Sequence, residues 1–490
     1  MKVAFIYIDP SYKAMGPFHI GIAALIARLR QGGHQCLFFH LLGDVAEAEY
    51  AAFLRENKPE VVAFSVTTNA LPHLAPLATV ARQNSNATII CGGVHPTLCP
   101  DDVIAIKGID AVCRGEGEEA LLELCHRLQG GKDISDIPSL WVKGVEKGEI
   151  YKNPLRPLCQ DLDTLPFPDR QVFPYANSFD LKFMKRGVFM ASRGCPYNCS
   201  YCCSPTMKQL YGGKKYIRFR SVDNLLEEVE TVVRGFPQIE YNVFHDDLLP
   251  MKKDWFHDFT REYARRIGLP FEMNCHPSLM DDDIARMAKA AGCALIRFGI
   301  ESGNERLRRK VLNRHVSNGR IIAAFQCCDR AGIQTLSYNM VGVPFEARKH
   351  VLDTIKLNAR VKPVVVHVST FYPYPGTKAY EICQREGLLS HRYTDSFYED
   401  SVLEQKSISS QQLRSLRERF QLLVRLYSRC DTMPKPIGWI LSKALDLAVM
   451  THAEGRLLRR LYGARGRDTA KDADPVYVLK NGRVKVWGKD

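Results

Sequence analysis

Short apolar runs of strand length alternate with helical segments through most of this 490-residue chain. Within the first 140 residues the apolar runs fall at residues 3–8, 36–40, 61–66, 88–91 and 111–113. Helical periodicity lies between them, as at residues 19–31, which end at Gly32-Gly33. This alternation predicts an α/β fold with a doubly wound, Rossmann-like parallel sheet that is covered by helices on both faces.

The same alternation resumes after residue 186. Further apolar runs fall at residues 241–244, 271–274, 295–300, 335–341 and 364–371, with helical segments between them. Together with the strand before residue 190 they make six βα units, which predicts a partial (β/α)6 barrel with its functional groups at the carboxyl ends of the strands.

The pattern divides the chain into four parts. We expect a Rossmann-like domain at 1–140, a linker at 141–185 that contains the turn-rich sequence LDTLPFPDR, and the barrel at 186–400. Residues 401–490 predict a mainly helical C-terminal region, and Asn481-Gly482 between two alternating runs predicts a terminal hairpin.

Three cysteines stand in the loop that follows the first strand of the predicted barrel. Cys195, Cys199 and Cys202 have the spacing C-x3-C-x2-C, and Tyr201 precedes the third. Three thiolates can hold three irons of a 4Fe–4S cluster and leave the fourth iron open to a ligand. The alternative is a structural zinc site, which needs a fourth ligand that the neighbouring Cys203 is poorly placed to supply. We therefore favour a 4Fe–4S cluster.

This cysteine spacing, with an aromatic residue before the last cysteine, resembles that of the radical S-adenosylmethionine (SAM) superfamily, in which SAM chelates the open iron. FHDD at 244–247, GIESG at 299–303, NMVGVP at 339–344 and PYPGT at 373–377 resemble strand-end elements of the same family. The resemblance implies that SAM is bound by Tyr201, Asp246, Asp247, Glu301, Ser302, Asn339 and Gly342. Because adjacent residues of a strand point to opposite faces, Asp246 and Asp247 are not expected to share a metal ion.

Polar and glycine residues follow the strands of the first domain, at the edge where open α/β sheets bind ligands. The first strand lacks the G-x-G-x-x-G that a dinucleotide would require. GGVHPT at 92–97 and RGEGE at 114–118 instead resemble the cobalamin-binding domain that precedes many radical SAM barrels. The resemblance implies cobalamin contacts from Thr67, Gly92, Gly93, His95, Gly115 and Glu116.

The cobalt-ligating motif D-x-H-x-x-G of other cobalamin domains is absent. Whether cobalamin has a lower axial ligand here is left open, with His19 and His95 the nearest histidines. A sheet that binds no cofactor is the alternative.

The combined resemblance implies a cobalamin-dependent radical SAM enzyme. Such an enzyme would methylate an unactivated carbon of a small molecule or lipid through a 5′-deoxyadenosyl radical and methylcobalamin, with electrons from an external donor such as flavodoxin or ferredoxin. A radical SAM oxidative cyclase of the tetrapyrrole type is the first alternative, and a non-catalytic corrinoid-binding protein is the second. No catalytic side chain is assigned beyond the cluster ligands.

Composition and charge restrict the expected cellular compartment and the expected partners. The sixteen cysteines are scattered, no signal-peptide pattern is present and no run reaches eighteen apolar residues, so we expect a cytoplasmic protein with reduced thiols. The net charge of +13 is spread along the chain without a nucleic-acid-binding module, so no nucleic acid partner is expected. The predicted helix at 437–461 is apolar with a basic end at Arg456, Arg459 and Arg460. It could lie on a membrane surface or pack on the barrel.

Overall fold

The computed structural model describes residues 1–9, 16–43, 47–146, 148–213, 215–390, 401–455, 477–480 and 482–486. The chain forms two compact units. The first comprises residues 1–196, 202–239 and 374–377, and the second comprises residues 197–201, 240–373 and 378–490.

The first unit is built on a seven-stranded sheet with the order β2-β1-β3-β4-β5-β6-β7. Five parallel strands form most of it: β1 (Lys2–Asp9), β2 (Gln35–Leu42), β3 (Val61–Ser65), β4 (Thr88–Gly92) and β5 (Ala111–Cys113). The predicted parallel sheet is thus confirmed. Two short antiparallel strands, β6 (Leu140–Lys143) and β7 (Ile150–Lys152), extend it into the stretch that we expected to be a linker.

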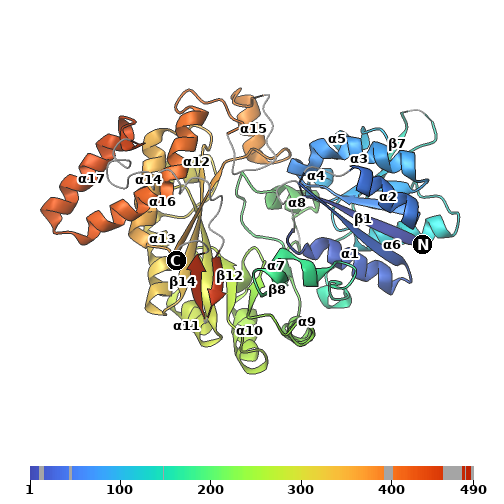
Figure 1. Cartoon of the computed structure of the whole chain (residues 1–490), viewed down its shortest axis with the longest axis horizontal. Helices are drawn as coiled ribbons and strands as arrows, with labels where there is room; N and C mark the ends of the chain where they lie inside the picture. Colours follow the sequence, from blue (N-terminus) through green and yellow to red (C-terminus); the bar gives the residue numbers. More distant parts are fainter. Residues whose placement is uncertain are drawn as a thin grey trace. The chain divides into compact units, whose positions relative to one another are not determined.

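Helices cover both faces of this sheet. α1 (Ile20–Gln31) and α6 (Glu118–Gln129) pack together on one face, and α2 (Glu47–Asn57) and α3 (Leu71–Asn84) pack together on the other (Figure 1). The His19 side chain caps α1 by accepting a hydrogen bond from the Ile22 N–H at 3.1 Å. Three short elements that the sequence did not predict follow β3 and β4: η1 (Thr68–Ala70), α4 (Val94–Leu98) and α5 (Pro100–Ile104).

The rest of the first unit consists of short elements around the cysteine loop and one longer helix. They are η2 (Leu162–Thr164), η3 (Tyr175–Asn177), α7 (Phe179–Lys182), β9 (Ser192–Arg193), α8 (Ser204–Leu210), β10 (Arg218–Phe219) and α9 (Val222–Gly235). β9 and β10 pair with each other in an antiparallel ribbon.

The barrel sheet has six strands in the order β15-β14-β13-β12-β11-β8, which confirms the predicted partial barrel. The strands are β8 (Arg186–Phe189), β11 (Tyr241–Phe244), β12 (Phe271–Cys275), β13 (Cys293–Glu301), β14 (Gln334–Val341) and β15 (Val365–Thr370). Each neighbouring pair from β11 to β15 is parallel.

Helical segments connect the strands of the second unit and surround them. They are η4 (Leu249–Met251), α10 (Lys253–Arg266), α11 (Asp282–Ala290), α12 (Glu305–Lys310), α13 (Asn318–Arg330), α14 (Arg348–Val361) and α15 (Lys378–Arg385).

The C-terminal region adds two helices and a hairpin to the second unit, as expected. α16 (Ser410–Thr432) packs on α14 through Leu416, Phe420 and Leu423, and α17 (Lys435–Met450) packs on α16. The antiparallel hairpin of β16 (Tyr477–Lys480) and β17 (Arg483–Val486) packs against the first residues of the barrel strands. Arg456, Arg459 and Arg460 lie outside the described residues. No helix among the described residues is long and apolar enough to cross a membrane.

Candidate cofactor sites

The cysteine loop begins with a glycine that its backbone requires. Gly194 has φ +95°, and a Cβ atom built there would lie 2.5 Å from the Tyr216 carbonyl oxygen. Cys195 and Cys202 are partly exposed, and Cys199 is buried. None of the three is in a disulfide, and the Cys202 sulfur accepts a hydrogen bond from the Ser204 N–H at 3.4 Å. Three cysteine sulfurs on one short loop fit the donor set of a 4Fe–4S cluster with an open iron.

In the second unit, the segment after α12 holds the middle of this loop. The Ser200 N–H donates to the Leu312 carbonyl at 3.0 Å, and the Ser200 hydroxyl donates to the Val311 carbonyl at 2.6 Å. Asn313 donates from its side-chain amide to the Asn198 carbonyl at 2.7 Å. These bonds fix the backbone on both sides of Cys199.

A buried arginine lies beside Cys199. Arg314 Nη1 is 3.7 Å from the Cys199 sulfur, and Nη2 donates to the Gly299 carbonyl at 2.7 Å. Burial raises the pKa of the Cys199 thiol, while the Arg314 charge favours the thiolate. A thiolate is the form that binds iron, so the guanidinium stabilises the ligand state. Arg314 could not be predicted from the sequence, because its loop carries no recognisable motif.

Two of the predicted SAM residues meet at this arginine. Glu301 ends β13 with φ +65°, where the register between β13 and β14 shifts. Burial raises the pKa of the Glu301 carboxyl, whereas Arg314 and a hydrogen bond with Tyr201 favour its ionised form. The second unit therefore brings Tyr201, Glu301 and Cys199 together around one guanidinium.

The two aspartates after β11 have different surroundings. Asp246 is 1 % exposed, and its carbonyl accepts a hydrogen bond from the Asn274 side-chain amide at 2.8 Å. The Asp247 side chain reaches solvent, although desolvation by the surrounding protein raises its pKa. The two carboxyl groups therefore differ in exposure, with Asp246 buried and Asp247 exposed.

Ser302 is fully buried in the turn after Glu301. Its carbonyl accepts a hydrogen bond from Arg308 Nη1 at 2.5 Å, and its hydroxyl accepts one from the Asn304 N–H at 3.3 Å. Arg308 is also fully buried and donates to the Val316 carbonyl at 2.7 and 2.9 Å. Arg308, which the sequence analysis also missed, therefore ties the GIESG turn to the loop that carries Arg314.

The last two predicted SAM residues have packing roles. The Asn339 side chain exchanges hydrogen bonds with Asn358 of α14 and donates to the His367 carbonyl at 3.0 Å. It points to the helix layer, so any SAM contact at Asn339 falls to the backbone. Gly342 has φ +83°, and a Cβ atom there would lie 2.5 Å from the Leu413 side chain. Only glycine fits both constraints.

The predicted cobalamin domain contains a mostly apolar cavity of about 300 Å³. It lies between the sheet and α1, and its walls include Gly92, Gly93, Gly115 and Glu116. Gly93 has φ +113°, and a Cβ atom there would lie 2.7 Å from the Val66 carbonyl oxygen. A concave, glycine-lined, apolar site at the carboxyl ends of the strands fits part of a bulky cofactor such as cobalamin.

The other two predicted cobalamin residues do not line this cavity. Thr67 is exposed before η1, and His95 is buried in α4. The carboxylate of Glu116 is committed to the fold: it accepts hydrogen bonds from Arg193 at 2.9 Å, from Arg218 at 2.9 Å and from the Cys159 N–H at 3.1 Å. Burial disfavours the Glu116 charge, but the two arginines outweigh it and lower its pKa.

Comparison with known proteins decides the identity of both domains. Residues 190–357 match the model of the radical SAM superfamily, and residues 17–125 match that of the B12 binding domain. This chain is a cobalamin-dependent radical SAM enzyme. Its cofactors are a 4Fe–4S cluster, SAM and cobalamin, as predicted. The alternative of a non-catalytic corrinoid-binding protein is wrong.

Relatives of this radical SAM enzyme include both reaction types that the sequence suggested. An uncharacterized methyltransferase of Pyrococcus horikoshii is 28 % identical over 87 % of this chain and 92 % of its own length. The anaerobic magnesium-protoporphyrin IX monomethyl ester cyclase of Rubrivivax gelatinosus is 24 % identical over 76 % and 68 %. The solved structure of the radical SAM methyltransferase TsrM from Kitasatospora setae shares the fold, with a TM-score of 0.63 and 18 % identity over 80 % of this chain and 76 % of that one.

Proposed function

We propose that this enzyme transfers a methyl group to an unactivated carbon of a small molecule or lipid. The observation that carries the proposal is the presence, on one chain, of a loop with three cysteines outside any disulfide and a glycine-lined cavity in a cobalamin-binding domain. The similarity to a methyltransferase along 92 % of that relative's length supports it.

When bound, the reduced cluster with SAM supplies a radical that abstracts hydrogen, and cobalamin supplies the methyl group. In the proposed mechanism Cys195, Cys199 and Cys202 hold the cluster, and Arg314 balances the charge of the Cys199 thiolate. We assign Tyr201, Glu301, Ser302 and the backbone at Asn339 and Gly342 to the SAM site. Asp246 and Asp247 would accept hydrogen bonds from the SAM amino group.

In the first unit, we assign Gly92, Gly93, Gly115 and the backbone of Glu116 to cobalamin, because they line the cavity. Thr67 lies at the same strand edge, and its hydroxyl is exposed. The role of the glycines is to let a flat cofactor approach the main chain closely.

The test uses enzyme whose cluster has been reconstituted without oxygen. Mass spectrometry of extracts from cells with and without the protein identifies a substrate candidate, which is then supplied with SAM, cobalamin and a reductant. We expect a methylated product together with 5′-deoxyadenosine and S-adenosylhomocysteine. The Cys202→Ala variant should lose the cluster and all products, whereas Cys203→Ala, changed at the adjacent cysteine, should keep both. Undiminished turnover without cobalamin would contradict the proposal.

A second candidate function is oxidative ring formation. The similarity to the magnesium-protoporphyrin cyclase of Rubrivivax gelatinosus over 76 % of this chain favours it. New ring or oxygen insertion without methyl transfer in the same assay would decide for this candidate.

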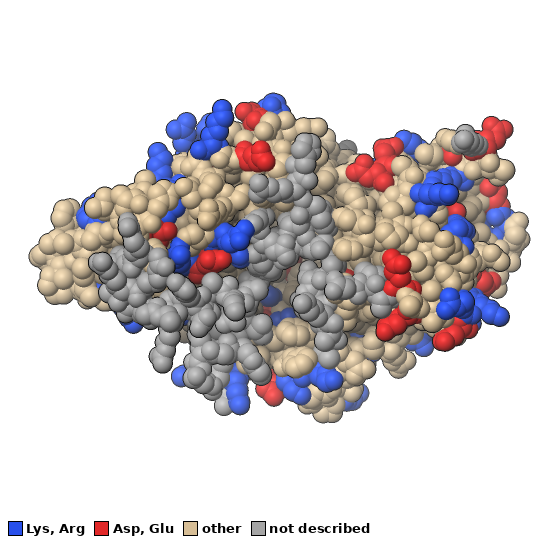
Figure 2. Space-filling view, turned by 45° about the horizontal axis from the view of Figure 1, so that its top comes forward, with Lys and Arg blue, Asp and Glu red and all other residues tan. Residues whose placement is uncertain are grey.

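We further propose a cytoplasmic enzyme that receives electrons from a flavodoxin or ferredoxin and touches a membrane surface through α17. The support for membrane contact is the apolar exposed face of this helix, formed by Ile437, Ile440, Leu441 and Leu447. The surface around α17 shows few charged side chains (left in Figure 2).

A further inference from the structure

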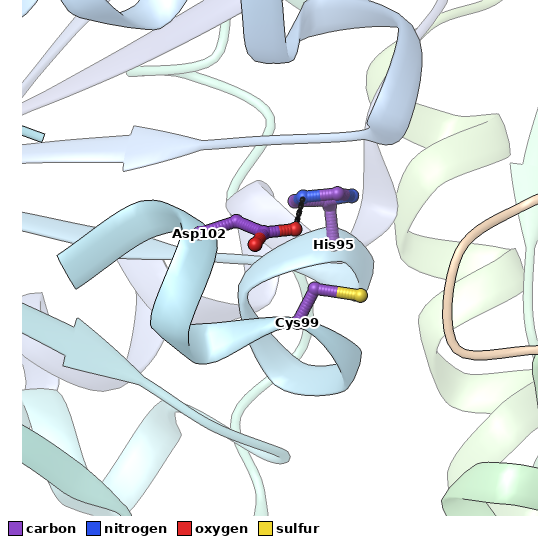
Figure 3. Close-up of side chains that lie close together, drawn as sticks. All are labelled: His95, Cys99 and Asp102. Carbon is purple, nitrogen blue, oxygen red and sulfur yellow. Dashed lines mark ion pairs between the residues drawn. The ribbon is translucent and has the colours of Figure 1, made fainter. Parts of the chain in front are cut away.

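The turn after β4 leads into two short helices that place three metal-ligating side chains together. His95 lies in α4, Cys99 joins α4 to α5, and Asp102 lies in α5. Cys99, four residues after His95 and three before Asp102, lies in the non-helical turn between the two helices. One ligand atom from each residue lies within 4.8 Å of the other two. Figure 3 shows the His95 ring and the Asp102 carboxylate turned toward one another, with Cys99 beside them.

His95 has a polar atom that the protein does not satisfy. The side chain is 2 % exposed, and its Nδ1 lies 3.2 Å from the Thr68 hydroxyl oxygen. Its buried Nε2 has no hydrogen-bond partner among the residues that the structure describes. The Asp102 oxygen lies 3.8 Å from Nε2, which is too far for a hydrogen bond. A buried polar atom without a partner is costly, so a ligand between Nε2 and Asp102 would remove a penalty that the fold otherwise carries.

The distance between His95 Nε2 and the Asp102 oxygen suits an ion bound between them. Zn²⁺ bonds histidine nitrogen and carboxylate oxygen at about 2.0–2.2 Å each, so two such ligands lie between about 3 and 4 Å apart across the ion. Thr68 can accept the Nδ1 proton, which leaves the Nε2 lone pair free to bind. The outer side of the cluster is open, because the Asp102 side chain is 60 % exposed and Cys99 is partly exposed.

We propose that His95 Nε2, Cys99 Sγ and an Asp102 carboxylate oxygen bind one divalent cation of the Zn²⁺ class, with a water molecule as fourth ligand. The mixed nitrogen, sulfur and oxygen donor set selects zinc over the hard cations Mg²⁺ and Ca²⁺, which take oxygen ligands only. Binding releases the thiol proton of Cys99 to solvent, and no electron transfer is involved.

The ion would clamp α4 to α5 and so hold the turn at Gly92 and Gly93, which lines the cavity of the first unit. His95 would act as a structural ligand and would be unavailable as the lower axial ligand of cobalt. This answers the question that the missing D-x-H-x-x-G motif leaves open for His95.

The test measures zinc on the full-length holoenzyme, in which iron and cobalt report cluster and cobalamin loading in the same sample. After equilibration with Zn²⁺ and removal of unbound ions, elemental analysis should give one zinc per chain. X-ray absorption at the zinc edge should show a single sulfur ligand at about 2.3 Å. Because iron fills the cysteine loop in this sample, zinc there would appear as lost iron.

Three variants keep the proposal falsifiable. Cys99→Ser and Asp102→Asn should each weaken zinc binding at least tenfold, and Cys99→Ser should remove the sulfur signal. Cys159→Ser, a partly exposed cysteine of the same unit, is the matched control and should bind zinc as the native chain does. If one variant fails to fold, shown by lost iron and cobalt, the other decides. Less than about one tenth of a zinc per chain in the native enzyme, or equal zinc in Cys99→Ser, would overturn the proposal.

Discussion

Individual buried charges act on the loop that carries the three cysteines, and Arg314 is the clearest example. Its guanidinium spans the Cys199 sulfur and the Gly299 carbonyl. Charge and hydrogen bonds at the sulfur atoms set the reduction potential of an iron–sulfur cluster. We expect Arg314→Gln to keep the cluster but to shift its potential to more negative values by roughly tens of millivolts. A redox titration followed by electron paramagnetic resonance measures this.

The matched control for Arg314→Gln is Arg309→Gln, because Arg309 is an exposed arginine of α12. It should leave the potential unchanged. An unchanged potential in Arg314→Gln at full iron content would mean that the guanidinium does not act on the cluster.

Glu346 is a buried carboxyl whose protonation should control stability. It is fully buried, and one oxygen accepts a hydrogen bond from the Gly342 N–H at 2.5 Å. The other oxygen has no hydrogen-bond partner within the described part of the chain. Burial raises its pKa to about 8. Because the folded pKa exceeds the unfolded value of about 4.3, the stabilisation is complete below pH 4.3 and is lost as the pH rises through about 8.

We therefore expect the native protein to lose on the order of 3 kcal/mol of unfolding free energy from this group between pH 5 and 8. Glu346→Gln, which cannot ionise, should lack this loss and be the more stable form at pH 8. Urea denaturation across that range measures the difference. Glu404→Gln, changed at an exposed carboxylate, should follow the native profile. Parallel profiles for native protein and Glu346→Gln would contradict the raised pKa.

The sequence could predict which residue types would bind the cluster and SAM, but it could not predict the charged side chains that lie beside them. The three cysteines, Tyr201 and Glu301 follow from local motifs. Arg314 does not, because its contact with Cys199 depends on how a distant loop folds back. Asn339 and Glu116 stand in recognisable motifs, but their side chains bind other parts of the fold. Asn339 binds Asn358, and Glu116 binds Arg193 and Arg218, which only the tertiary fold brings close.

At the scale of elements, Glu116 joins three segments. Its carboxylate lies after β5 and binds Arg193 of β9 and Arg218 of β10. Arg193 also binds Glu118 of α6 at 2.6 Å and stands two residues before Cys195. This network therefore holds the ribbon that carries the cluster loop to the cobalamin-binding domain of the same unit.

Glu116→Gln should lower the unfolding free energy by about 1–3 kcal/mol, because it removes the counter-charge of the buried Arg218 guanidinium and one of the two carboxylates that pair with Arg193. The lowered pKa of Glu116 means that its stabilisation is present above pH 4.3 and is lost as the pH falls through the folded pKa. The gap between native protein and variant should thus close in acid. Glu119→Gln, changed at a carboxylate that is 42 % exposed and pairs with Arg28, should cost less than about 1 kcal/mol. Urea denaturation at neutral and acid pH measures both, and equal losses would contradict the argument.

The terminal hairpin closes the amino end of the barrel strands. The Tyr477 hydroxyl donates to the buried Glu272 carboxylate at 2.7 Å, and Leu479 packs on the same strands. Tyr477→Phe keeps the packing but removes this donor, so we expect a loss of about 1–3 kcal/mol in urea denaturation. Tyr338→Phe, at a tyrosine that is 36 % exposed, should change stability by less than about 0.5 kcal/mol. An unchanged unfolding free energy in Tyr477→Phe would contradict a stabilising role for this hydrogen bond.

Long periodic elements were predictable, and short ones were not. The strands of both sheets and helices such as α9 and α14 agree with the expected positions to within a few residues, because each buries a periodic apolar face. β6 and β7 have four and three residues, and α4 and α5 have five each, too few for a period to show. The antiparallel pairing of β6 and β7 depends on the exposed edge of β5, which is a tertiary feature. The predicted domain boundaries stay a prediction.

At the scale of the whole molecule, the net charge of +13 and the apolar face of α17 both favour binding to a membrane surface. One side of α17 packs on α16 through Leu445 and Val449. On its other side Ile437, Ile440 and Leu447 are 54–65 % exposed. A helix that is apolar on two sides needs a second apolar neighbour, and a positively charged protein is attracted to an anionic bilayer surface.

We expect the enzyme to sediment with vesicles of anionic phospholipid, more weakly with neutral vesicles, and less in high salt. Ile440→Asp with Leu447→Asp should reduce binding at least tenfold, since burying each apolar side chain contributes about 1.5–3 kcal/mol. Val364→Asp, at an apolar residue that is 44 % exposed outside α17, should bind normally. Iron content confirms that the variants are folded. If the double variant binds vesicles like the native enzyme, α17 is not the contact, and if it instead abolishes a concentration-dependent dimer, the face belongs to a second copy of the chain.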